Sequence, residues 1–553
     1  MSALTSAVLP VSDEYRARAG REAVWLPVLV LGLTAAVYLG SLGGNWVWDD
    51  VYQLRDNPAI TQPLVLATTD VWGPTGFADE RNTPVYRPLA MLSHVPGQML
   101  FAGPGVERLL SLALHLAAVL LVGAIALSLG LSPRAAWFGA ACFGLHPAAT
   151  EGVAWISARG DLLGVVLVAG GMAALGRDRP WLAGALVALA PFCKEPFVLA
   201  PLALGIWMLG LGRRDASAML LSLLGVAVYF AARHVFGIVA PGAGPASDPA
   251  ALLGAIGAVA ERGVLLLLDP TAPDAQLPFA ASRAGGVLAV IVALPALLLV
   301  PGRPWLAALM APLPLLALAA PASLGNGLVS DRYFQAALLG VAVAAACGYA
   351  VLEARHSWAP LLFALPLLWA PFTSLRALQW MDNETLFRAA VARHPDSGEA
   401  LFHLAYALHV EGDDCAAALP LYNRAAMQST RAGNNLQACL FEEGRLQEAA
   451  EIGPELAGRD PHSATPAVNT ARALSLLGDQ EGAERWAREA IRRDPRRASA
   501  WVLLGNVLGI EGRYAEAADA FDGALGVDPD LAAALRGRAL AHRRLTEGPP
   551  RDS

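Results

Sequence analysis

The sequence predicts an all-α fold: a polytopic membrane domain of about eleven spans, followed by a solenoid of helical repeats. Two observations lead to this prediction. First, 55% of the 553 residues are hydrophobic and only 16% are charged, whereas an average soluble domain carries roughly 25% charged residues. Second, long apolar runs fill the chain up to about residue 379. A polar region, rich in Ala, Leu, Arg and Glu, then follows.

The apolar runs predict the membrane spans, because a helix needs about 20 apolar residues to cross about 30 Å of hydrocarbon. The first run, 24–40, follows Arg16, Arg18 and Arg21 without an evident small-residue cleavage site, so we expect an uncleaved signal anchor. The further expected spans are 108–130, 135–145, 161–176, 181–192, 197–211, 216–236, 284–301, 304–320, 335–352 and 359–377.

Three runs leave the span count open. Those at 135–145 and 181–192 are short, and are either tilted ends of longer helices or halves of a hairpin inside the membrane. The run 251–268 carries Glu261 and Arg262 at its centre, so we expect a membrane-surface helix or a buried outer helix. If that segment crosses the membrane, every later loop changes side.

Loop arginines predict the orientation, because cytoplasmic loops carry an excess of Lys and Arg. With the N-terminus in the cytoplasm, every second connection is basic. The basic connections contain Arg134, Arg177, Arg213, Arg303 and Arg355. The loops 41–107 and 237–283, and everything after 378, then face outward. The Arg-rich, Ala-rich composition is typical of a GC-rich bacterial genome, so we expect a multi-pass protein of the bacterial inner membrane with a periplasmic C-terminal region.

The polar region carries a repeat. Glycines recur at 412, 444, 478 and 512, and Asp-Pro pairs begin at 460, 494 and 528. A 34-residue period in a helical composition is typical of tetratricopeptide (TPR) repeats. We expect small Gly505 and Ala517 to let paired helices approach, Phe521 to fill the gap, and Pro529 to end a helix. Such stacks present a concave binding surface; a spacer without its own ligand is an equal alternative.

The predicted domains are a membrane domain over 1–379, a TPR domain of about four repeats over 380–545, and a disordered tail over 546–553. Cys415 begins the second helix of one expected repeat, and Cys439 ends the first helix of the next. Neighbouring TPR helices run antiparallel, which brings these ends together. An oxidising compartment permits a disulfide there, and two free buried thiols are the alternative.

Several function classes are excluded or unsupported. The net charge of −7 gives no basic footprint for nucleic acid. The five cysteines form no C-x-x-C pair, and no H-E-x-x-H motif occurs, so no metal site is predicted. Lys194 is the single lysine among 40 basic residues and lies outside any G-x-x-x-x-G-K-[ST] context, which excludes a Walker A phosphate loop.

Ionisable residues beside membrane spans are costly, so each set is a functional candidate. Asp49 and Asp50 follow the first span. Adjacent carboxylates repel, which raises one pKa and suits a general base; a helix cap or a solvated turn is the alternative. Arg87 precedes the second span.

The later loops supply two more sets. In the first, which begins at His146, Glu151 and Arg159 share one face if the segment after Pro147 is helical, and Asp161 is alternatively a helix cap. The second set consists of Lys194, Glu195, Asp331, Arg332 and Tyr333. Two alternatives without a function would explain the single lysine at 194: an ion pair of Lys194 with Glu195 at a buried site, or chance. All these sets fall on the predicted outward side, where they could line one cavity.

These residues resemble the transmembrane and TPR-repeat-containing O-mannosyltransferases and their bacterial relatives, within the wider GT-C glycosyltransferases. The resemblance preserves motif order along nearly the whole chain, although Asp331 stands where animal members often have Glu. The matching elements are Trp48-Asp49-Asp50 with Asn57-Pro58, Tyr86-Arg87-Pro88-Leu89, His146-Pro147 with Thr150-Glu151 and Val153, Arg159 with Asp161-Leu162-Leu163, Lys194-Glu195, Arg332-Tyr333, and Trp380 leading into Thr385-Leu386-Phe387.

The resemblance implies an inverting transferase that acts on the extracytoplasmic side of the membrane. It would move a sugar, by analogy mannose, from a polyprenyl-phosphate lipid to an acceptor hydroxyl, with the TPR stack recruiting a protein acceptor. Asp49 or Asp50 is the expected base. Cations would hold the charge that develops on the phosphate. The need for a divalent metal stays open. The residues expected to bind donor phosphate or sugar are Arg87, His146, Glu151, Arg159, Asp161, Lys194, Glu195, Asp331, Arg332 and Tyr333.

Two alternatives remain. A non-catalytic membrane scaffold would use the TPRs alone and would tolerate loss of both aspartates. A lipid or solute transporter should carry lines of charge through the spans, whereas the polar motifs here stop on one predicted face.

Overall fold

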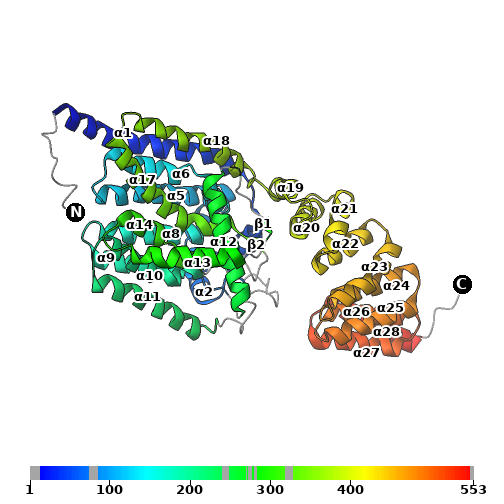
Figure 1. Cartoon of the computed structure of the whole chain (residues 1–553). Coiled ribbons are helices and arrows are strands. Elements are labelled where there is room, and N and C mark those ends of the chain that lie inside the picture. The colour runs from blue at the N-terminus through cyan, green and yellow to red at the C-terminus, as the bar shows by residue number, and fades with distance from the viewer. Residues whose placement is uncertain are drawn as a thin grey trace. The chain divides into compact units, whose positions relative to one another are not determined.

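The computed structural model describes residues 13–73, 85–238, 248–269, 271, 277–278, 283–317 and 328–547. It divides into two compact units, 1–386 and 387–553. The division lies a few residues after the expected boundary at 379, in the first turns of the helix that begins at Asn383 (Figure 1). The Met381 carbonyl and the Asn383 side chain accept hydrogen bonds from the loop after the first helix.

The first unit is helical, as expected, apart from one antiparallel pair of two-residue strands, β1 (Leu277–Pro278) and β2 (Leu328–Val329). Its helices are α1 (Asp13–Tyr38), α2 (Pro63–Thr68), α3 (Pro88–Leu92), α4 (Val95–Leu100), α5 (Pro104–Ser128), α6 (Pro133–Gly144), α7 (Thr150–Ala154), α8 (Arg159–Leu175), α9 (Pro180–Leu189), α10 (Ala200–Gly210), α11 (Ala216–Val235), α12 (Pro249–Leu268), α13 (Arg283–Leu298), α14 (Pro304–Met310), α15 (Leu313–Ala317), α17 (Gln335–Glu353) and α18 (Ala364–Leu378).

Within the described residues, seven helices are long and apolar enough to cross a membrane, which makes the chain a multi-pass membrane protein. They are Val24–Gly43, Pro104–Ser128, Ile156–Leu175, Ala216–Val235, Pro249–Leu267, Asp331–Glu353 and Ala359–Leu378. Shorter apolar helices of this unit cover Pro180–Phe192, Glu195–Gly210, Arg283–Leu298 and Pro304–Leu316.

Helix α12, expected at the membrane surface or as a buried outer helix, is among the seven candidate spans by its length and composition. Its central Arg262 is buried, and its guanidinium is paired with the Asp331 carboxylate. The ion pair explains how a charge is accommodated at the centre of this apolar helix, because a buried charge requires a partner.

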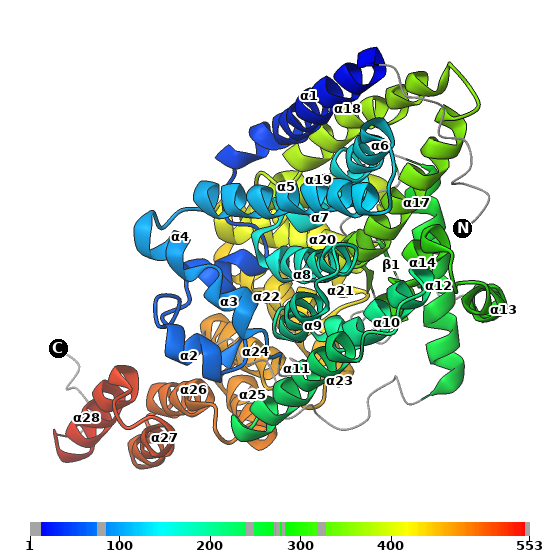
Figure 2. The ribbon, with the colours of Figure 1, turned by 90° about the vertical axis from the view of Figure 1, so that its left-hand side faces the viewer.

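Packing inside the unit places α1 alongside α18 and α6, and α5 against both α6 and α8, as both views show (Figures 1 and 2). The core of this bundle is built largely from alanine, valine and leucine, with few large side chains. Small residues let membrane helices approach closely. Gly139 is one case, because a Cβ there would lie 2.5 Å from the backbone oxygen of Ala342 on α17.

The second unit is a stack of antiparallel helix pairs, as in the TPR solenoid that the sequence predicts. Helix α19 (Asn383–Arg393) leads into the stack. The pairs are α20 (Gly398–Tyr406), extended by a π-helical turn, with α21 (Cys415–Ala426); α22 (Thr430–Glu442) with α23 (Leu446–Arg459); α24 (Thr465–Leu477) with α25 (Gln480–Arg493); and α26 (Ala498–Ile510) with α27 (Tyr514–Val527). Helix α28 (Ala532–Glu547) closes the stack and includes the first residues of the expected tail, while 548–553 lie outside the described residues.

The repeat chemistry follows the sequence pattern. Each of the last three pairs ends on the aspartate of an Asp-Pro dipeptide, because proline cannot continue the helix. A Cβ at Gly505 would lie 2.8 Å from the Phe521 ring, which fills the space between α26 and α27. The predicted roles of Gly505 and Phe521 are therefore confirmed.

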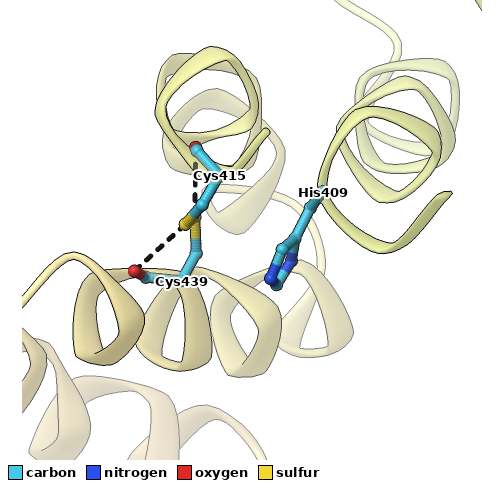
Figure 3. Close-up of side chains that lie close together, drawn as sticks. All are labelled: His409, Cys415 and Cys439. Carbon is cyan, nitrogen blue, oxygen red and sulfur yellow. Dashed lines mark hydrogen bonds between the residues drawn. A yellow bond between two sulfur atoms is a disulfide. The ribbon is translucent and has the colours of Figure 1, made fainter. Parts of the chain in front are cut away.

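Cys415 and Cys439 form a disulfide, with their Cα atoms 5.6 Å apart, so of the two alternatives the bridge is the one observed (Figure 3). His409 lies beside it, with nitrogen and sulfur atoms of the three residues within 4.8 Å of one another. Its two ring nitrogens contact the Tyr422 hydroxyl at 3.3 Å and the Glu442 carboxylate at 2.9 Å. Because the sulfurs are bonded to each other, they present no thiolate to a metal in this state.

We predict that Cys415→Ser lowers the free energy of unfolding of the repeat region by about 3 kcal/mol, because the bridge closes a loop with a sequence separation of 24 residues. Thermal unfolding of the purified chain, with and without reductant, measures the loss. Cys347→Ser, which removes a free thiol, is the control. A variant whose unfolding and gel mobility match those of the oxidised parent would contradict the prediction.

Candidate active site

The acidic pair lies just after the first membrane helix, at the start of the π-helical turn η2 (Val51–Arg55). Asp50 is fully buried. One carboxylate oxygen accepts bonds from the Ser157 N–H at 2.8 Å and the Ser157 hydroxyl at 2.5 Å, and the other accepts from the Val47 N–H at 3.2 Å. Asp49 is half-buried. The two neighbours therefore differ: Asp50 anchors the loop, and Asp49 is the more accessible carboxylate.

Burial raises the pKa of Asp50 to about 6, because the charged form loses its hydration. Hydrogen bonds from Ser157 and Val47, and the positive charge of Arg108, act in the opposite direction. A carboxylate with such a pKa changes its charge close to neutral pH.

The segment that carries Ser157 is not one continuous helix. Helix α7 ends at Ala154, Trp155 is extended (ψ 115°), and a 3-10 turn, η5 (Ile156–Ala158), precedes α8. The helical face that would have aligned Glu151 with Arg159 is therefore absent from this segment. The break instead places the Trp155 ring between Trp48 and Trp380, with centroid separations of 5.0 and 5.6 Å.

One ion pair and a backbone hydrogen bond join this segment to the 3-10 turn η9 (Asp331–Phe334). The Arg332 guanidinium bonds to Glu151 at 2.5 Å and lies 4.5 Å from the centroid of the Trp155 ring. Glu151 also accepts from the backbone N–H of Asp331 at 2.9 Å. Asp331 itself is paired with Arg262 at 2.6 Å. Glu151 thus fixes the turn that presents Arg332.

Lys194 is buried and bonds to Asp161 at 2.5 Å, not to its neighbour Glu195. Asp161 lies in the first turn of α8, where its carboxylate serves this ion pair. The Lys194 ammonium also lies 5.1 Å from the centroid of the Tyr333 ring. Burial lowers the pKa of Lys194 to about 8. Asp161 opposes this shift, while the charges of Arg332 and Arg87 add to it, so three cations are concentrated here.

Arg87 forms an ion pair with Glu195, the acid that follows Lys194 in the sequence. Its guanidinium donates two bonds to one Glu195 oxygen, at 3.0 and 2.8 Å. Both side chains are about one-third exposed, at 27% and 34%, whereas the Lys194 and Arg332 side chains are 6% and 15% exposed. Arg87 is therefore the most accessible of the cations described in this cluster.

Two predicted residues occupy separate surroundings. Arg159 is 1% exposed; it pairs with Glu107 at 2.5 Å and donates to the Ser93 carbonyl and the Ser111 hydroxyl. His146 accepts from the Ala148 N–H at 3.1 Å and packs against Trp369. Burial lowers the pKa of His146 to about 4, which keeps the ring neutral as this acceptor.

The structure thus joins nine of the predicted residues through contacts between loops. The nine are Asp50, Arg87, Glu151, Asp161, Lys194, Glu195, Asp331, Arg332 and Tyr333, and Asp49 adjoins Asp50. Sequence reasoning missed Ser157, Glu107 and Arg108 and gave no partner for Arg262. A charged residue within an apolar run was the available signal for Glu107 and Arg108. Ser157 had none, because its role depends on the break at Trp155.

A second group of charges lies at the other end of α1. Arg134 contacts Glu22 at 2.5 Å and Glu353 at 3.6 Å. Glu22 lies near the start of α1, and Asp50 follows its end. A helix rises about 1.5 Å per residue, so the stretch of α1 from Glu22 to Tyr38 separates the two groups by about the thickness of a bilayer core.

Comparison with known proteins fits this architecture. The tetratricopeptide repeat family matches residues 375–435 and 468–531. Protein O-mannosyl-transferase TMTC3 of Mus musculus is 30% identical over 181 residues, which cover 30% of this chain and 20% of that protein. Over the aligned residues, the chain is similar to the TMTC proteins. The resemblance predicted from the motifs is therefore confirmed over the aligned region.

A second TMTC protein and a solved structure are also similar to parts of this chain. Protein O-mannosyl-transferase Tmtc1 of Drosophila melanogaster is 31% identical over 188 residues, or 32% of this chain and 21% of that protein. The chain thus spans about a fifth of the length of these TMTC relatives. Among solved structures, MamA protein is similar at 18% identity and a TM-score of 0.26, over 28% of this chain and 84% of that one.

Removing Arg262 should leave the buried Asp331 carboxylate without its main partner. We predict that Arg262→Ala lowers the free energy of unfolding by about 3–5 kcal/mol, the usual result of breaking a buried ion pair. The midpoint of thermal unfolding in detergent checks this, with exposed Arg355→Ala as the control. Equal midpoints for the two variants would show that the pair adds no stability.

Proposed function

We propose that this TMTC relative is an integral-membrane glycosyltransferase of the GT-C type. It transfers a sugar from a polyprenyl-phosphate donor to an acceptor hydroxyl, on protein and outside the cytoplasm, in a single inverting displacement. The observation that carries the proposal is the segment from Glu151 to Ser157, which bonds to Arg332 of the cation group and to Asp50, the neighbour of the half-buried acid Asp49. Mannose is the sugar favoured by the names of the relatives.

Asp49 is the general base in this mechanism. An acceptor hydroxyl must reach the base, and Asp50 is fully buried with hydrogen bonds to both its carboxylate oxygens. Asp49 takes the hydroxyl proton while the acceptor oxygen attacks the anomeric carbon, and the bond from that carbon to the phosphate oxygen breaks. Asp50 holds the loop so that its neighbour stays in place.

The phosphate leaving group needs positive charge more than a proton. Arg87, Lys194 and Arg332 supply three cations, each held by its own acid in the resting chain. Arg159 is assigned a structural role, because Glu107, Ser93 and Ser111 take up its guanidinium.

The cluster also offers polar atoms to a sugar. Among the described residues, one buried oxygen of Glu195 and the indole N–H of Trp155 have no hydrogen-bond partner. Such unpaired buried groups are costly. Sugar hydroxyls both donate and accept hydrogen bonds, so a bound sugar would satisfy both atoms.

The repeats supply a place for a protein acceptor. A groove of about 930 Å³ runs across α24, α26 and α28, and its charged lining residues are Arg472 and Arg544. Leu476, Ile510 and Leu540 are more than half exposed in it. An apolar groove bearing two cations suits an extended acceptor segment better than a spacer without a ligand.

A scaffold or a transporter fits this arrangement less well. A scaffold has no use for three cations concentrated around Lys194. In a transporter, a line of charge would link the Asp50 cluster to the Arg134 group at the other end of α1, and the bundle core between them is built mainly from aliphatic side chains.

Substituting the two aspartates separates their roles. We predict that Asp49→Asn lowers transfer by about 10²–10⁴-fold, the usual contribution of a general base. Asp50→Asn should lower it by only about tenfold, because Asn keeps an oxygen for Ser157 but turns an amide toward the Val47 N–H. Mass spectrometry of extracytoplasmic glycoproteins, with each variant replacing the parent, gives the readout.

The matched control is Asp56→Asn, which removes an exposed carboxylate of the same loop. Glycoproteins unchanged when the gene is deleted would overturn the proposed activity. Normal transfer by a folded Asp49→Asn variant would instead overturn only the assignment of the base.

The pH dependence should follow Asp50. Below its pKa of about 6 the carboxylate is protonated and its hold on the loop weakens, so transfer is expected to fall by about tenfold, as in Asp50→Asn, when the pH falls through about 6. Ser157→Ala removes a hydrogen bond that lowers this pKa. The acidic limb of the pH–rate profile should therefore move to higher pH. An unmoved limb in Ser157→Ala would show that another group controls it.

A further inference from the structure

The chain just before the repeats is bonded to the loop that carries the acidic pair. The Asn45 N–H donates to the Met381 carbonyl at 2.6 Å, and the Trp48 N–H donates to the Asn383 side-chain oxygen at 2.8 Å. The two segments are more than 330 residues apart in the sequence. Both belong to the first compact unit, so these are contacts within one body.

Arg108 of α5 stabilises this junction with hydrogen bonds to the backbone. Its guanidinium donates to three backbone carbonyls, those of Asn45 at 2.5 Å, Trp380 at 2.8 Å and Ala154 at 3.2 Å. The side chain is 1% exposed. Gly44 fits tightly here, because a Cβ would lie 2.6 Å from the Arg108 guanidinium and 2.8 Å from the Met381 carbonyl oxygen. One cation therefore holds together three segments: the acidic loop, the end of α7 and the end of α18.

At this junction the backbone of Trp48 has an unusual conformation. Its φ of 56° is left-handed, which is uncommon for a bulky residue and persists only where the surroundings enforce it. Two interactions enforce it here: the bond from its N–H to Asn383, and the stacking of its ring on Trp155, which in turn stacks on Trp380. The next residue along the chain is Asp49.

We propose that Asn383 is a positioning residue for the acidic pair: its side-chain oxygen holds Trp48 in the left-handed conformation that presents Asp49. The inference rests on the proposed transferase function and adds a further residue to it. Asn383 is also the first residue of α19, the helix that leads into the repeats. The acid is thus held by the part of the chain at which the repeat region begins.

The side-chain oxygen of Asn383 bonds to the Trp48 backbone, so we expect its effect on the acidic pair to be one of geometry. Removing its oxygen leaves the Trp48 N–H without that acceptor and lets the backbone relax toward right-handed φ. The cations around Arg87 and Lys194 lie on other segments and keep their partners. Donor binding should therefore be unaffected while the reaction step slows.

The test compares Asn383→Ala, Asn383→Asp and Gln447→Ala in the full-length chain. Asp retains an oxygen for the Trp48 N–H, whereas Ala does not. Gln447→Ala removes an amide side chain exposed on α23, away from the groove, and is the control. Two readouts are used: hydrogen exchange of the amides of residues 45–50, and kcat and KM for a polyprenyl-phosphate mannose donor with a Ser/Thr acceptor peptide.

We expect Asn383→Ala to speed exchange at residues 45–50 and to lower kcat about tenfold, with KM for the donor within twofold of the parent. Asn383→Asp should restore both quantities to within about twofold. Exchange and kcat in Asn383→Ala equal to those of Gln447→Ala would overturn the proposal. So would equal losses in the Ala and Asp variants, or a loss confined to KM.

Hydrogen exchange separates this proposal from the enzymatic one. If the parent transfers no sugar but Asn383→Ala loosens residues 45–50 and Asn383→Asp does not, the proposed function fails and the hold of Asn383 on the loop stands. If the parent transfers sugar and Asn383→Ala leaves both readouts unchanged, the positioning role fails alone.

Discussion

Burying a charge in a helical bundle requires a partner of opposite sign, and the first unit is organised around that requirement. Four cations each form an ion pair with an acid: Arg159 with Glu107, Arg262 with Asp331, Lys194 with Asp161, and Arg332 with Glu151. An unpaired charge at these positions would cost several kcal/mol. Each pair joins two segments that are distant in the sequence, so the pairs set how the loops meet at the end of the bundle.

The loop geometry follows from these pairs. Glu151 bonds both to the Arg332 guanidinium and to the backbone of the turn that carries it. The break at Trp155 turns Ser157 toward Asp50. One short segment, from Glu151 to Ser157, therefore fixes a cation on one side and an acid on the other, and the stacked tryptophans lie between them. The catalytic proposal depends on this double attachment.

The sequence predicted the kinds of element well and the pairings poorly. Apolar runs and a 34-residue period are local patterns, so the membrane helices and the TPR pairs could be read directly, including the contact of Gly505 with Phe521. The cysteine bridge was only one of two open alternatives, because the sequence does not show whether two nearby thiols are oxidised. Which acid meets which base depends on the tertiary packing of several loops. The expected neighbours, Lys194 and Glu195, each took a distant partner, and Arg159 turned away from the cation group. The difference between Asp49 and Asp50 could not be seen either, since burial and Ser157 create it.

Arg87 is already paired with Glu195, so an anion that binds to the Arg87 guanidinium competes with the Glu195 carboxylate. In the proposed function, a donor phosphate that replaces the Glu195 carboxylate on the Arg87 guanidinium would leave this acid without its cation, so the local charge would become more negative by the charge of the phosphate. A released carboxylate is a strong hydrogen-bond acceptor, which rewards a guest that carries hydroxyl groups next to its phosphate. A bare phosphate or a plain phospholipid offers no such compensation, so in the proposed function the displaced Glu195 carboxylate would favour a lipid that carries a sugar.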